Sequence, residues 1–566
     1  MIQDFRSAAC PDALSADVCI VGAGPAGISL AAALADSPWT VCLLEGGGAH
    51  TEAASQALNE GESVGPYALD PATCRLRALG GATRIWGGGC IPLSSAEMTR
   101  RDWVADDGWP IGWDELAPYY ARAGRICGIE PEAFDDGNYQ PHRVEAGDPP
   151  SLVDYRTSRT RPLDFGRAYR RRLRSAHGVQ LLLHANLLRL EAAPGAGAVR
   201  RAVIGSVDGR RGHVTARCFV LAAGGLENAR LLLLSDDVAA QGLGNAHDLV
   251  GRYFMDHPRC RLGTLTQGDL ARLAQLYSEP QDRHRAPAFR QLNLSLTAQR
   301  AHRLLHARAR PFAIERDPPE GLAALRALRA SLRRQRARHE AARVEASLLD
   351  ALDCELPQCQ IVPAPGNPGK LALRTLVHAD DVLRAAVRKF THRPVLETDR
   401  VELIGYFEQT PNRDSRITLS DQRDALGLRR IRVDWRLNAL DETSIRAAGA
   451  LIGQSLAQDF NGRFEPADWL VDPVAPLPLH GTAHHLGTTR MSDSPASGVV
   501  DRQCRVHGID NLYVAGSSVF PTGGWSFPTL TIVALALRIG DELRRRLPSM
   551  PMVGAHEAEA VAAGVH

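Results

Sequence analysis

The stretch from Val18 to Glu45 constrains the fold more than any other part of the chain. An apolar run, Val18–Val21, leads into the turn Gly22-Ala23-Gly24-Pro25-Ala26-Gly27, and an alanine-rich segment follows. A second apolar run then ends at Glu45. A strand, a Gly-x-Gly-x-x-Gly turn, a helix and a second strand ending in an acid form the βαβ unit that binds a dinucleotide. The sequence therefore predicts a dinucleotide site here.

Each residue of this pattern has a predicted role. Gly22 permits the tight turn, Gly24 lets the backbone approach a pyrophosphate, and Gly27 lets the helix lie close to the strand. The N–H groups at the start of the helix then face two phosphates. Glu45 follows Gly27 by eighteen residues, where a carboxylate can accept hydrogen bonds from ribose hydroxyls.

Length and composition narrow the class of protein. A chain of 566 residues is too long for one ordinary core, so we expect two joined domains. The net charge of +2 predicts no general affinity for nucleic acid. No apolar run is long enough to span a bilayer and no secretory signal is evident, so we expect a soluble protein without a membrane span.

Cysteine and histidine usage indicates neither a disulfide framework nor a metal site. The eleven cysteines are scattered, odd in number and lack a Cys-x-x-Cys pair, which favours free thiols in a reducing cytoplasm. The nineteen histidines include no His-Glu-x-x-His or comparable spacing, so no metal is expected.

Two further glycine-containing segments are candidates for contact with a flat ligand. Gly80–Gly89 holds five glycines around Trp86, which suits an ordered loop whose backbone passes close to a ligand. The apolar run His213–Ala223 ends at Gly224-Gly225 and continues into a helical pattern. No second Gly-x-Gly-x-x-Gly occurs, so electrons are expected to come from the substrate rather than from NAD(P)H.

The middle of the chain carries weaker signals. Residues 262–400 resemble mixed loops and helices, and Leu322, Leu325, Leu328 and Leu332 recur at helical spacing among arginines. Such a helix could touch a membrane surface or an acidic partner, but a solvated helix with its leucines on the core is favoured. Residues 404–409 and 415–419 are predicted to form a hairpin, and 430–435 a third strand of the same antiparallel sheet.

The C-terminal segment identifies a family. It contains His484-His485-Leu486-Gly487-Thr488, the strand pattern Leu512–Ala515 followed by Gly516-Ser517-Ser518, and Trp525-Ser526-Phe527-Pro528-Thr529 before an apolar helix. Together with the segments above, it resembles the glucose-methanol-choline (GMC) family of FAD-dependent oxidoreductases, especially the bacterial branch near pyranose oxidase and fructose dehydrogenase. The resemblance touches well over half the chain in the right order.

The resemblance implies a fold, a cofactor and a reaction. The fold is α/β, with a Rossmann-type FAD-binding domain and a second α+β substrate domain built on an antiparallel sheet. His484 matches the family's histidine beside flavin N5, where a neutral imidazole takes the hydroxyl proton while hydride leaves the same carbon. The helix after Pro528 is expected to aim its N-terminus at the flavin, and His485 is expected to pack.

The resemblance also implies which residues contact the cofactor. The expected set is Gly22, Gly24, Gly27, Glu45, Gly81, Thr83, Trp86, Gly87, Gly88, Leu187, Gly224, Gly516, Ser517, Pro528 and Thr529.

Two positions depart from the family pattern. The family usually has a second His or Asn directly before the helix proline, but this chain has Phe527, which can neither donate nor accept. Either Ser526 or a residue from elsewhere fills that role, or the reaction is not ordinary alcohol oxidation.

The second departure concerns the link to the flavin. Where pyranose oxidase carries its flavin-linking histidine, this chain has Ile85, so FAD is expected to bind without a covalent bond. Trp525 and Phe527 favour a bulky apolar substrate.

The resemblance leads to explicit domain bounds. We expect an FAD-binding domain over residues 1–260 with substrate-domain excursions around 100–180, a substrate domain over 261–480, a return to the FAD-binding domain over 481–548 and a flexible tail over 549–566.

Three functions remain possible at this stage. The first is FAD-dependent oxidation of a C–OH group of a small substrate to a carbonyl. The second is desaturation, decarboxylation or cyclisation on the same fold, because of Phe527. The third is a flavin-binding scaffold that docks through the basic helix. The electron acceptor, whether oxygen, a quinone or a protein, is open, and so is the oligomeric state.

Overall fold

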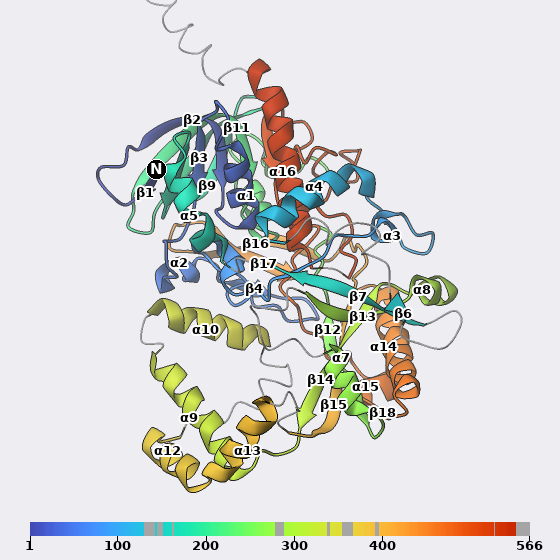
Figure 1. Cartoon of the computed structure of the whole chain (residues 1–566). Helices are drawn as coiled ribbons and strands as arrows, with labels where there is room; N and C mark the ends of the chain where they lie inside the picture. Colours follow the sequence, from blue (N-terminus) through green and yellow to red (C-terminus); the bar gives the residue numbers. More distant parts are fainter. Residues whose placement is uncertain are drawn as a thin grey trace, which may run out of the picture.

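A computed structural model describes residues 1–129, 142–143, 151–160, 164–277, 288–336, 340–353, 366–390, 396–525 and 527–550. The chain builds two large sheets that lie one above the other in Figure 1, with a group of helices to the lower left. The upper half is an α/β unit and the lower half an antiparallel sheet with helices on it.

The upper sheet has eight strands in the order β1-β8-β3-β2-β11-β10-β9, with β19 also paired to β11. All pairs are parallel except those of β10 with β9 and with β11. Its strands are β1 (Ile2–Asp4), β2 (Ala13–Val21), β3 (Val41–Leu44), β8 (Val179–Leu183), β9 (Asn186–Ala192), β10 (Val199–Gly205), β11 (Arg211–Leu221) and β19 (Leu512–Val514). The predicted α/β fold, with a Rossmann-type parallel sheet in this part of the chain, is confirmed.

The glycine turn produces the predicted helix. Pro25 opens α1 (Pro25–Leu34), where its fixed φ suits the first turn, and α1 packs against α16 (Thr529–Arg546) and α5 (Phe165–Ser175). The side chains of Ile20, Ile28 and Leu30 are fully buried, each contributing about 1.5–3 kcal/mol of hydrophobic stabilisation. Since α1 and α16 pack together, the two ends of the chain share one core.

The carboxyl ends of four parallel strands converge at one edge of this sheet. Gly22 follows β2, Glu45 follows β3, Gly224 comes shortly after β11, and Gly516 comes shortly after β19. Because these ends are neighbours in the sheet, segments nearly 500 residues apart in sequence meet at a single edge. Ligands of open α/β sheets bind at this edge.

The lower sheet has the order β18-β12-β15-β14-β13-β7-β5, with β6 paired to β7. Every pair in it is antiparallel. Its strands are β5 (Gly89–Cys90), β6 (His142–Arg143), β7 (Leu152–Arg159), β12 (Arg259–Thr266), β13 (Ala288–Leu294), β14 (Ala307–Glu315), β15 (Thr398–Phe407) and β18 (Arg463–Pro466). The expectation that 262–400 holds only loops and helices is therefore wrong, because β13, β14 and most of β12 lie within it.

The two faces of the lower sheet differ in character. One face joins a hydrophobic core with α14 (Ala439–Asp459), to which Ala307, Ala309 and Leu403 contribute. In β14 the alternate residues Arg308, Arg310 and Phe312 point to the opposite face, as the period of two in a strand requires. The helices of this half are α7 (Leu270–Tyr277), α8 (Leu296–His302) and α15 (Asp468–Val471) besides α14.

The predicted hairpin is wrong, because its two strands belong to different sheets. Residues 404–407 end β15 of the lower sheet, whereas β16 (Arg416–Arg423) pairs antiparallel with β17 (Arg429–Asp434) in a separate three-stranded sheet. The third strand there is β4 (Gly61–Ser63), which pairs parallel with β17. Ile417, Val433 and Trp435 form a small core of their own, so this sheet has an independent apolar centre.

The remaining helices surround the two halves. The remaining helical elements within residues 53–233 are α2 (Ala53–Ala57), η1 (Gly81–Arg84), α3 (Ser95–Met98), α4 (Trp113–Ile126) and α6 (Glu227–Leu233). The group at the lower left of Figure 1 comprises α9 (Glu320–Arg336), α10 (Glu340–Asp353), α12 (Pro368–Val377) and α13 (Ala379–Phe390). Two short 3₁₀ turns, η4 (Ser517–Val519) and η5 (Leu547–Ser549), complete the described elements.

The basic helix predicted around residue 322 is present as α9. Leu322 is buried, Leu325 and Leu328 are half-buried and Leu332 is 43% exposed, so the leucines become more exposed along the helix. Of the arginines interleaved with these leucines, Arg338 lies outside the described residues.

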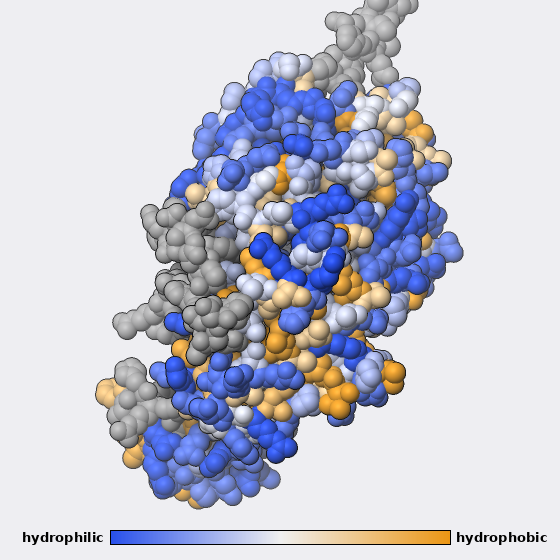
Figure 2. Space-filling view, turned by 90° about the vertical axis from the view of Figure 1, so that its right-hand side faces the viewer, coloured by the Kyte–Doolittle hydropathy of each residue, from blue (hydrophilic) through white to orange (hydrophobic). Residues whose placement is uncertain are grey.

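The face of the molecule in Figure 2 is hydrophilic over most of its upper part, and hydrophobic residues appear lower down as small separate groups. Within the described ranges, no helix is both long and apolar enough to cross a membrane.

Candidate active site

A cavity of about 1270 Å³ opens at the strand edge where the glycine turns converge. It is bounded by the upper sheet on one side and by residues of the lower sheet, including Arg259 and Arg310, on the other. The predicted cofactor residues that line it are Gly22, Gly24, Glu45, Gly81, Thr83, Trp86, Gly87, Gly88, Leu187, Gly224, Gly516, Ser517, Pro528 and Thr529. His484 and Phe527 line it as well. Gly27 does not.

The glycines of the first turn have different tasks. Gly22 has φ +104°, a left-handed conformation that disfavours a side chain, and a Cβ there would lie 2.6 Å from the carbonyl oxygen of Ala222. A Cβ on Gly27 would lie 1.9 Å from the carbonyl oxygen of Gly22, so Gly27 serves helix packing, as predicted. A Cβ on Gly24 would meet no atom within 4 Å, so Gly24 borders open space at the cavity.

Glu45 supports the turn from the neighbouring strand. Its carboxylate accepts hydrogen bonds from the N–H of Ala23 at 3.1 Å and the N–H of Gly47 at 2.8 Å. Burial raises its pKa, and these two bonds oppose that effect. The carboxylate thus fixes two backbone turns at the cavity wall.

The glycine-rich loop is held by hydrogen bonds and by ring packing. The N–H of Gly80 donates to the carbonyl of Ala23 at 2.9 Å, which fastens the loop to the first turn. The Thr83 hydroxyl donates to the carbonyl of Gly80 at 2.6 Å and accepts from the N–H of Phe165 at 3.1 Å. The Trp86 ring meets the Phe165 ring edge to face, with centroids 6.3 Å apart.

Asn228 joins the second glycine segment to the third. Its side-chain oxygen accepts from the N–H of Ala223 at 2.8 Å, and its amide nitrogen donates to the carbonyl of Ala515 at 3.1 Å and to Ser518 Oγ at 3.0 Å. The start of α16 faces the same cavity through Pro528 and Thr529. Buried side chains such as Asn228 therefore hold the backbone segments of the cavity wall in fixed positions relative to one another.

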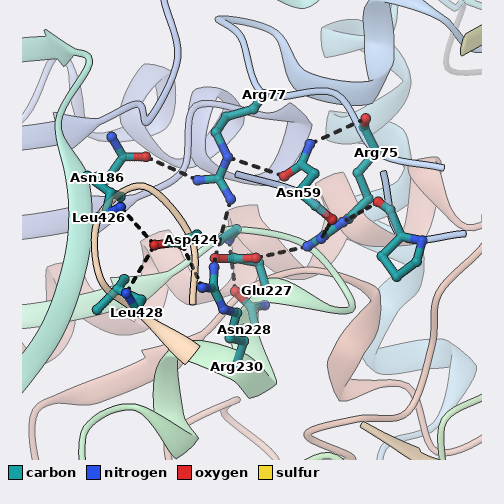
Figure 3. Close-up of polar contacts among 12 residues, drawn as sticks. Asn59, Arg75, Arg77, Asn186, Glu227, Asn228, Arg230, Asp424, Leu426 and Leu428 are labelled. Atoms are coloured by element: carbon teal, nitrogen blue, oxygen red, sulfur yellow. Dashed lines mark hydrogen bonds and ion pairs between the residues drawn. The ribbon is translucent and has the colours of Figure 1, made fainter. Parts of the chain in front are cut away.

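A buried ionic cluster closes one side of the cavity, and Figure 3 shows it. Glu227 receives Arg75 at 2.8 Å, Arg230 at 3.0 Å and Arg77 at 3.3 Å, and Arg230 also reaches Asp424 at 2.7 Å. Burial acts to raise the pKa of Glu227, but the three guanidinium groups hold it well below its usual range. No local sequence pattern predicts this cluster, because its members are scattered between residues 75 and 424.

The central feature of the site is a pair of histidines. His484 Nδ1 lies 2.8 Å from His257 Nδ1, and His257 Nε2 lies 3.3 Å from the carbonyl oxygen of Gly523. A carbonyl oxygen only accepts, so His257 carries its proton on Nε2 and its Nδ1 is an acceptor. His484 must then donate from Nδ1, which leaves the lone pair of His484 on Nε2.

The pKa values of both histidines favour the neutral state that this arrangement needs. Burial, followed by the positive charge of Arg308, lowers the pKa of His257 to about 4. Burial, His257 and Arg308 lower the pKa of His484 well below its ordinary value. Both rings are therefore uncharged near neutral pH, and His484 presents an accepting nitrogen.

Asp256 fixes the backbone on which His484 sits. Its carboxylate accepts from the N–H of His257 at 2.7 Å, from the N–H and hydroxyl of Thr482, and from the N–H groups of Ala483 and His484. Ala483 has φ +60°, an uncommon conformation for alanine, and these bonds hold it there. The bend aims the following histidine at the cavity.

Phe527 partly fills the position beside His484. Its ring centroid lies 6.0 Å from that of His484 and 6.4 Å from that of Phe289, and both contacts are edge to face. Ser526, predicted as its polar alternative, lies outside the described residues. Trp525 is buried against Tyr155 and is not among the residues that line the cavity, so the substrate inference drawn from it is not supported.

His485 was expected to pack. Its side chain is 7% exposed and its ring lies 6.0 Å from that of Phe254, although it also borders the cavity.

His257 is a candidate functional residue that sequence patterns do not predict. The segment Met255-Asp256-His257-Pro258 stands out in the sequence, but nothing there links it to a histidine 227 positions later.

Two family models match this chain. Residues 17–239 match the model described as FAD dependent oxidoreductase, and residues 411–536 match the C-terminal model described as GMC oxidoreductase. The second match contains His484 and the start of α16.

The C-terminal region, residues 411–536, is that of a GMC oxidoreductase.

Curated relatives are similar to parts of this chain. 6'''-hydroxyparomomycin C oxidase of Streptomyces lividus is 31% identical over 148 residues, 24% of each chain. 2-methyl-1,2-propanediol dehydrogenase of Mycolicibacterium austroafricanum is 31% identical over 25% of this chain and 24% of its own. The fructose dehydrogenase large subunit of Gluconobacter japonicus is 24% identical over 59% of this chain and 48% of its own. The chain thus spans about a quarter of the length of the first two and about half of the third.

Solved structures support the fold over nearly the full length of the chain. Pyridoxine 4-oxidase from Mesorbium loti has a TM-score of 0.53 at 17% identity, covering 94% of this chain and 99% of that one. Formate oxidase has a TM-score of 0.56 at 17% identity, covering 96% and 100%. At this identity the likeness shows the fold alone, and it agrees with the α/β fold class predicted from the sequence.

The residues at the cavity fit FAD. A Cβ on Gly24, Gly87 or Gly224 would meet no protein atom within 4 Å, so three backbone segments leave room for a long, flat ligand. Glu45 lies at one part of the cavity wall, where its carboxylate suits the hydroxyls of a ribose. The N-terminus of α16 lies at another part, where its dipole suits a ring that gains negative charge.

Proposed function

We propose that this enzyme oxidises a C–OH group of a small organic substrate to a carbonyl, with His484 as the general base. The observation that carries the proposal is the Nδ1–Nδ1 contact of 2.8 Å between His257 and His484. It supports a His484 tautomer whose free lone pair is on Nε2, in a side chain that lines the cavity.

The role of His484 follows from this state. Nε2 accepts the proton of the substrate hydroxyl, and the charge that results is shared through Nδ1–H with His257. A positioned base of this kind contributes about 10² to 10⁴ in rate. FAD, when bound, supplies the two-electron acceptor for the hydrogen that leaves carbon.

The remaining cavity residues have supporting roles in the proposal. The first turn of α16, beginning at Thr529, favours negative charge that develops at its end. The glycines of the three turns, Thr83, Trp86, Leu187 and Ser517 would hold the cofactor through close backbone approach and packing. Glu45 would accept hydrogen bonds from the ribose.

We further propose that FAD is held without a covalent bond. Ile85, at the position expected for a linking histidine, is buried among Leu76, Ala78 and Leu348 and offers no nucleophile. Denaturing the holoenzyme should release all the yellow colour into the supernatant. Colour that stays with the precipitated protein would contradict non-covalent binding.

The domain division belongs to the proposal too. The upper sheet with α16 would be the FAD domain, and the lower sheet with α14 the substrate domain. A cytoplasmic location is proposed because the nine cysteines of the described part of the chain are all free.

The test is an anaerobic half-reaction. Purified holoenzyme is mixed with a panel of alcohols without oxygen, and flavin absorbance and carbonyl product are measured together. Oxidation of C–OH predicts one carbonyl formed for each flavin bleached. Two other outcomes would instead favour the alternatives raised by Phe527: bleaching without a carbonyl product favours a desaturation, and turnover without net bleaching favours a decarboxylation or cyclisation.

A further inference from the structure

Four arginines gather on the substrate side of the cavity. Arg159 ends β7, Arg259 begins β12, and Arg308 and Arg310 lie in β14. Arg159, Arg259 and Arg310 line the cavity directly, and the first two are less than one-tenth exposed. Each of these side chains brings a positive charge to one part of the wall, and a buried cation is favourable only with polar or anionic partners.

The register of the sheet explains why these residues meet. Tyr406 of β15 is opposite Arg259 on one side and opposite Arg308 on the other, so the three side chains form one row across the sheet. Arg310 follows Arg308 by two residues and projects to the same face. The arginine face is therefore built by regular strand pairing.

Arg308 is the strongest evidence that a charge is missing. It is 4% exposed, and its Nε has no hydrogen-bond partner. One terminal nitrogen donates to Gln291 Oε1 at 3.0 Å, but Arg308 forms no ion pair with any carboxylate of the described ranges. Burial, with the charges of Arg310 and Arg259, lowers the pKa of Arg308 to about 10, and only the Tyr406 hydroxyl acts in the opposite direction.

Two buried carboxylates of the described residues, Glu408 and Asp256, are engaged elsewhere. Glu408 accepts from both terminal nitrogens of Arg101, at 2.6 and 2.8 Å, and from the N–H of His306. Asp256 holds the His484 bend through five hydrogen bonds.

Aromatic rings lie among the arginines. The guanidinium of Arg308 lies 4.8 Å from the centre of the Phe527 ring, and that of Arg159 lies 5.1 Å from the centre of the Phe289 ring. Phe527 in turn meets His484 edge to face. The cavity next to the base thus combines an apolar wall with strong positive charge.

We propose that the arginine face binds an anionic group of the substrate, so that the substrate is an alcohol with an apolar or aromatic body and a carboxylate or phosphate. The inference rests on the proposed function, because it concerns the substrate of the same site. The anion supplies the missing charge beside Arg308, the rings contact the body, and the hydroxyl is left facing His484.

The test measures binding rather than turnover. FAD-loaded enzyme is titrated by calorimetry with benzoate, with phenyl phosphate and with benzamide, a neutral analogue of benzoate. At least one of the two anions is expected to bind about tenfold or more tightly than benzamide, because a hydrogen bond to a charged group contributes about 1.5–3 kcal/mol. Tighter binding of benzoate indicates that the anionic group of the substrate is a carboxylate. Tighter binding of phenyl phosphate indicates that it is a phosphate.

Matched variants locate the anion. Arg259→Gln and Arg310→Gln are each expected to remove about tenfold or more of the anion affinity and to leave benzamide binding unchanged. Arg310→Lys, which keeps the charge, should retain more affinity than Arg310→Gln. Arg300→Gln, on the exposed face of α8, serves as the control and should change nothing.

Equal binding of benzamide and both anions to the wild-type enzyme overturns the inference, whatever the variants do. Failure of the anion site can be distinguished from failure of the proposed function. If alcohols bleach the flavin but anions gain no affinity, only the anion site is wrong. If anions bind preferentially but no alcohol ever bleaches the flavin, the proposed oxidation is wrong while the anion site stands.

Discussion

At the scale of single residues, the chemistry depends on how two histidine rings share one hydrogen bond. His257 fixes the proton on His484 Nδ1 only because its own Nε2 donates to the carbonyl of Gly523. His257 is therefore a positioning residue, since it acts on the reaction through His484.

Substitutions at His257 should separate hydrogen bonding from packing. Asparagine can still accept from His484 Nδ1, whereas phenylalanine fills the space without accepting. We expect His257→Phe to lower the rate of flavin reduction by about 10- to 100-fold and His257→Asn to restore most of it, as for other supporting residues of a catalytic group. Equal losses in both variants, at equal FAD content, would assign His257 to packing alone.

The depressed pKa of His484 gives a prediction for the pH profile. Below its pKa the imidazole carries a proton and cannot accept another, so activity falls as pH falls. Because burial, His257 and Arg308 all lower this pKa, the acid limb of kcat/KM should lie below the ordinary histidine value of about 6.5. A midpoint at or above that value would show that His484 is not the group described here.

At the scale of elements, the first glycine turn offers a matched pair of substitutions. A Cβ at Gly24 enters open cavity, whereas a Cβ at Gly27 lies 1.9 Å from a carbonyl oxygen. Gly24→Ala should lower FAD affinity by about tenfold or more while the apoprotein keeps its stability. Gly27→Ala should instead destabilise the apoprotein by about 1–3 kcal/mol or more.

Titration with FAD and thermal unfolding of the apoprotein distinguish the two effects. If Gly24→Ala binds FAD as tightly as the wild type, the pyrophosphate does not lie against this turn.

The same elements show what the sequence could predict. The βαβ unit was predictable because its strands, turn and helix are consecutive in sequence and each has a strong local pattern. The strands β12 to β14 were missed because their pattern is unusual: in β14 arginines alternate with alanines, so the buried face lacks large apolar residues. The wrong hairpin arose because residues 404–407 and 415–419 are close in sequence, yet their strands pair with distant partners.

The histidine pair sets a different limit on prediction. Local sequence identified His484, because it sits in a motif. Its partner depends on the path of the chain between residues 257 and 484, which no local pattern encodes. The arginine face likewise becomes visible only once the strand register brings β12 and β14 to either side of β15.

At the scale of the whole molecule, the Glu227 cluster connects segments that are far apart. It ties Arg75 and Arg77 of the loop before η1 to α6 and, through Arg230, to the segment after β16 (Figure 3). Removing its central carboxylate leaves three buried guanidinium groups without that partner.

Glu227→Gln should therefore lower the free energy of unfolding by about 3–5 kcal/mol, as breaking a buried ion pair does. Glu397→Gln is the control, because the Arg316–Glu397 pair is 66% exposed on both sides and should contribute about 1 kcal/mol or less. Urea unfolding of the two variants measures the difference. A loss of stability at Glu227 no larger than at Glu397 would mean that the cluster does not hold these segments together.

The most direct test of the central claim is the rate of anaerobic flavin reduction in wild-type enzyme and in His484→Ala, compared at equal FAD occupancy with a reactive alcohol. The account predicts that the variant keeps its flavin and its fold but reduces the flavin about 10² to 10⁴ times more slowly. A variant that reduces its flavin as fast as the wild type would contradict it.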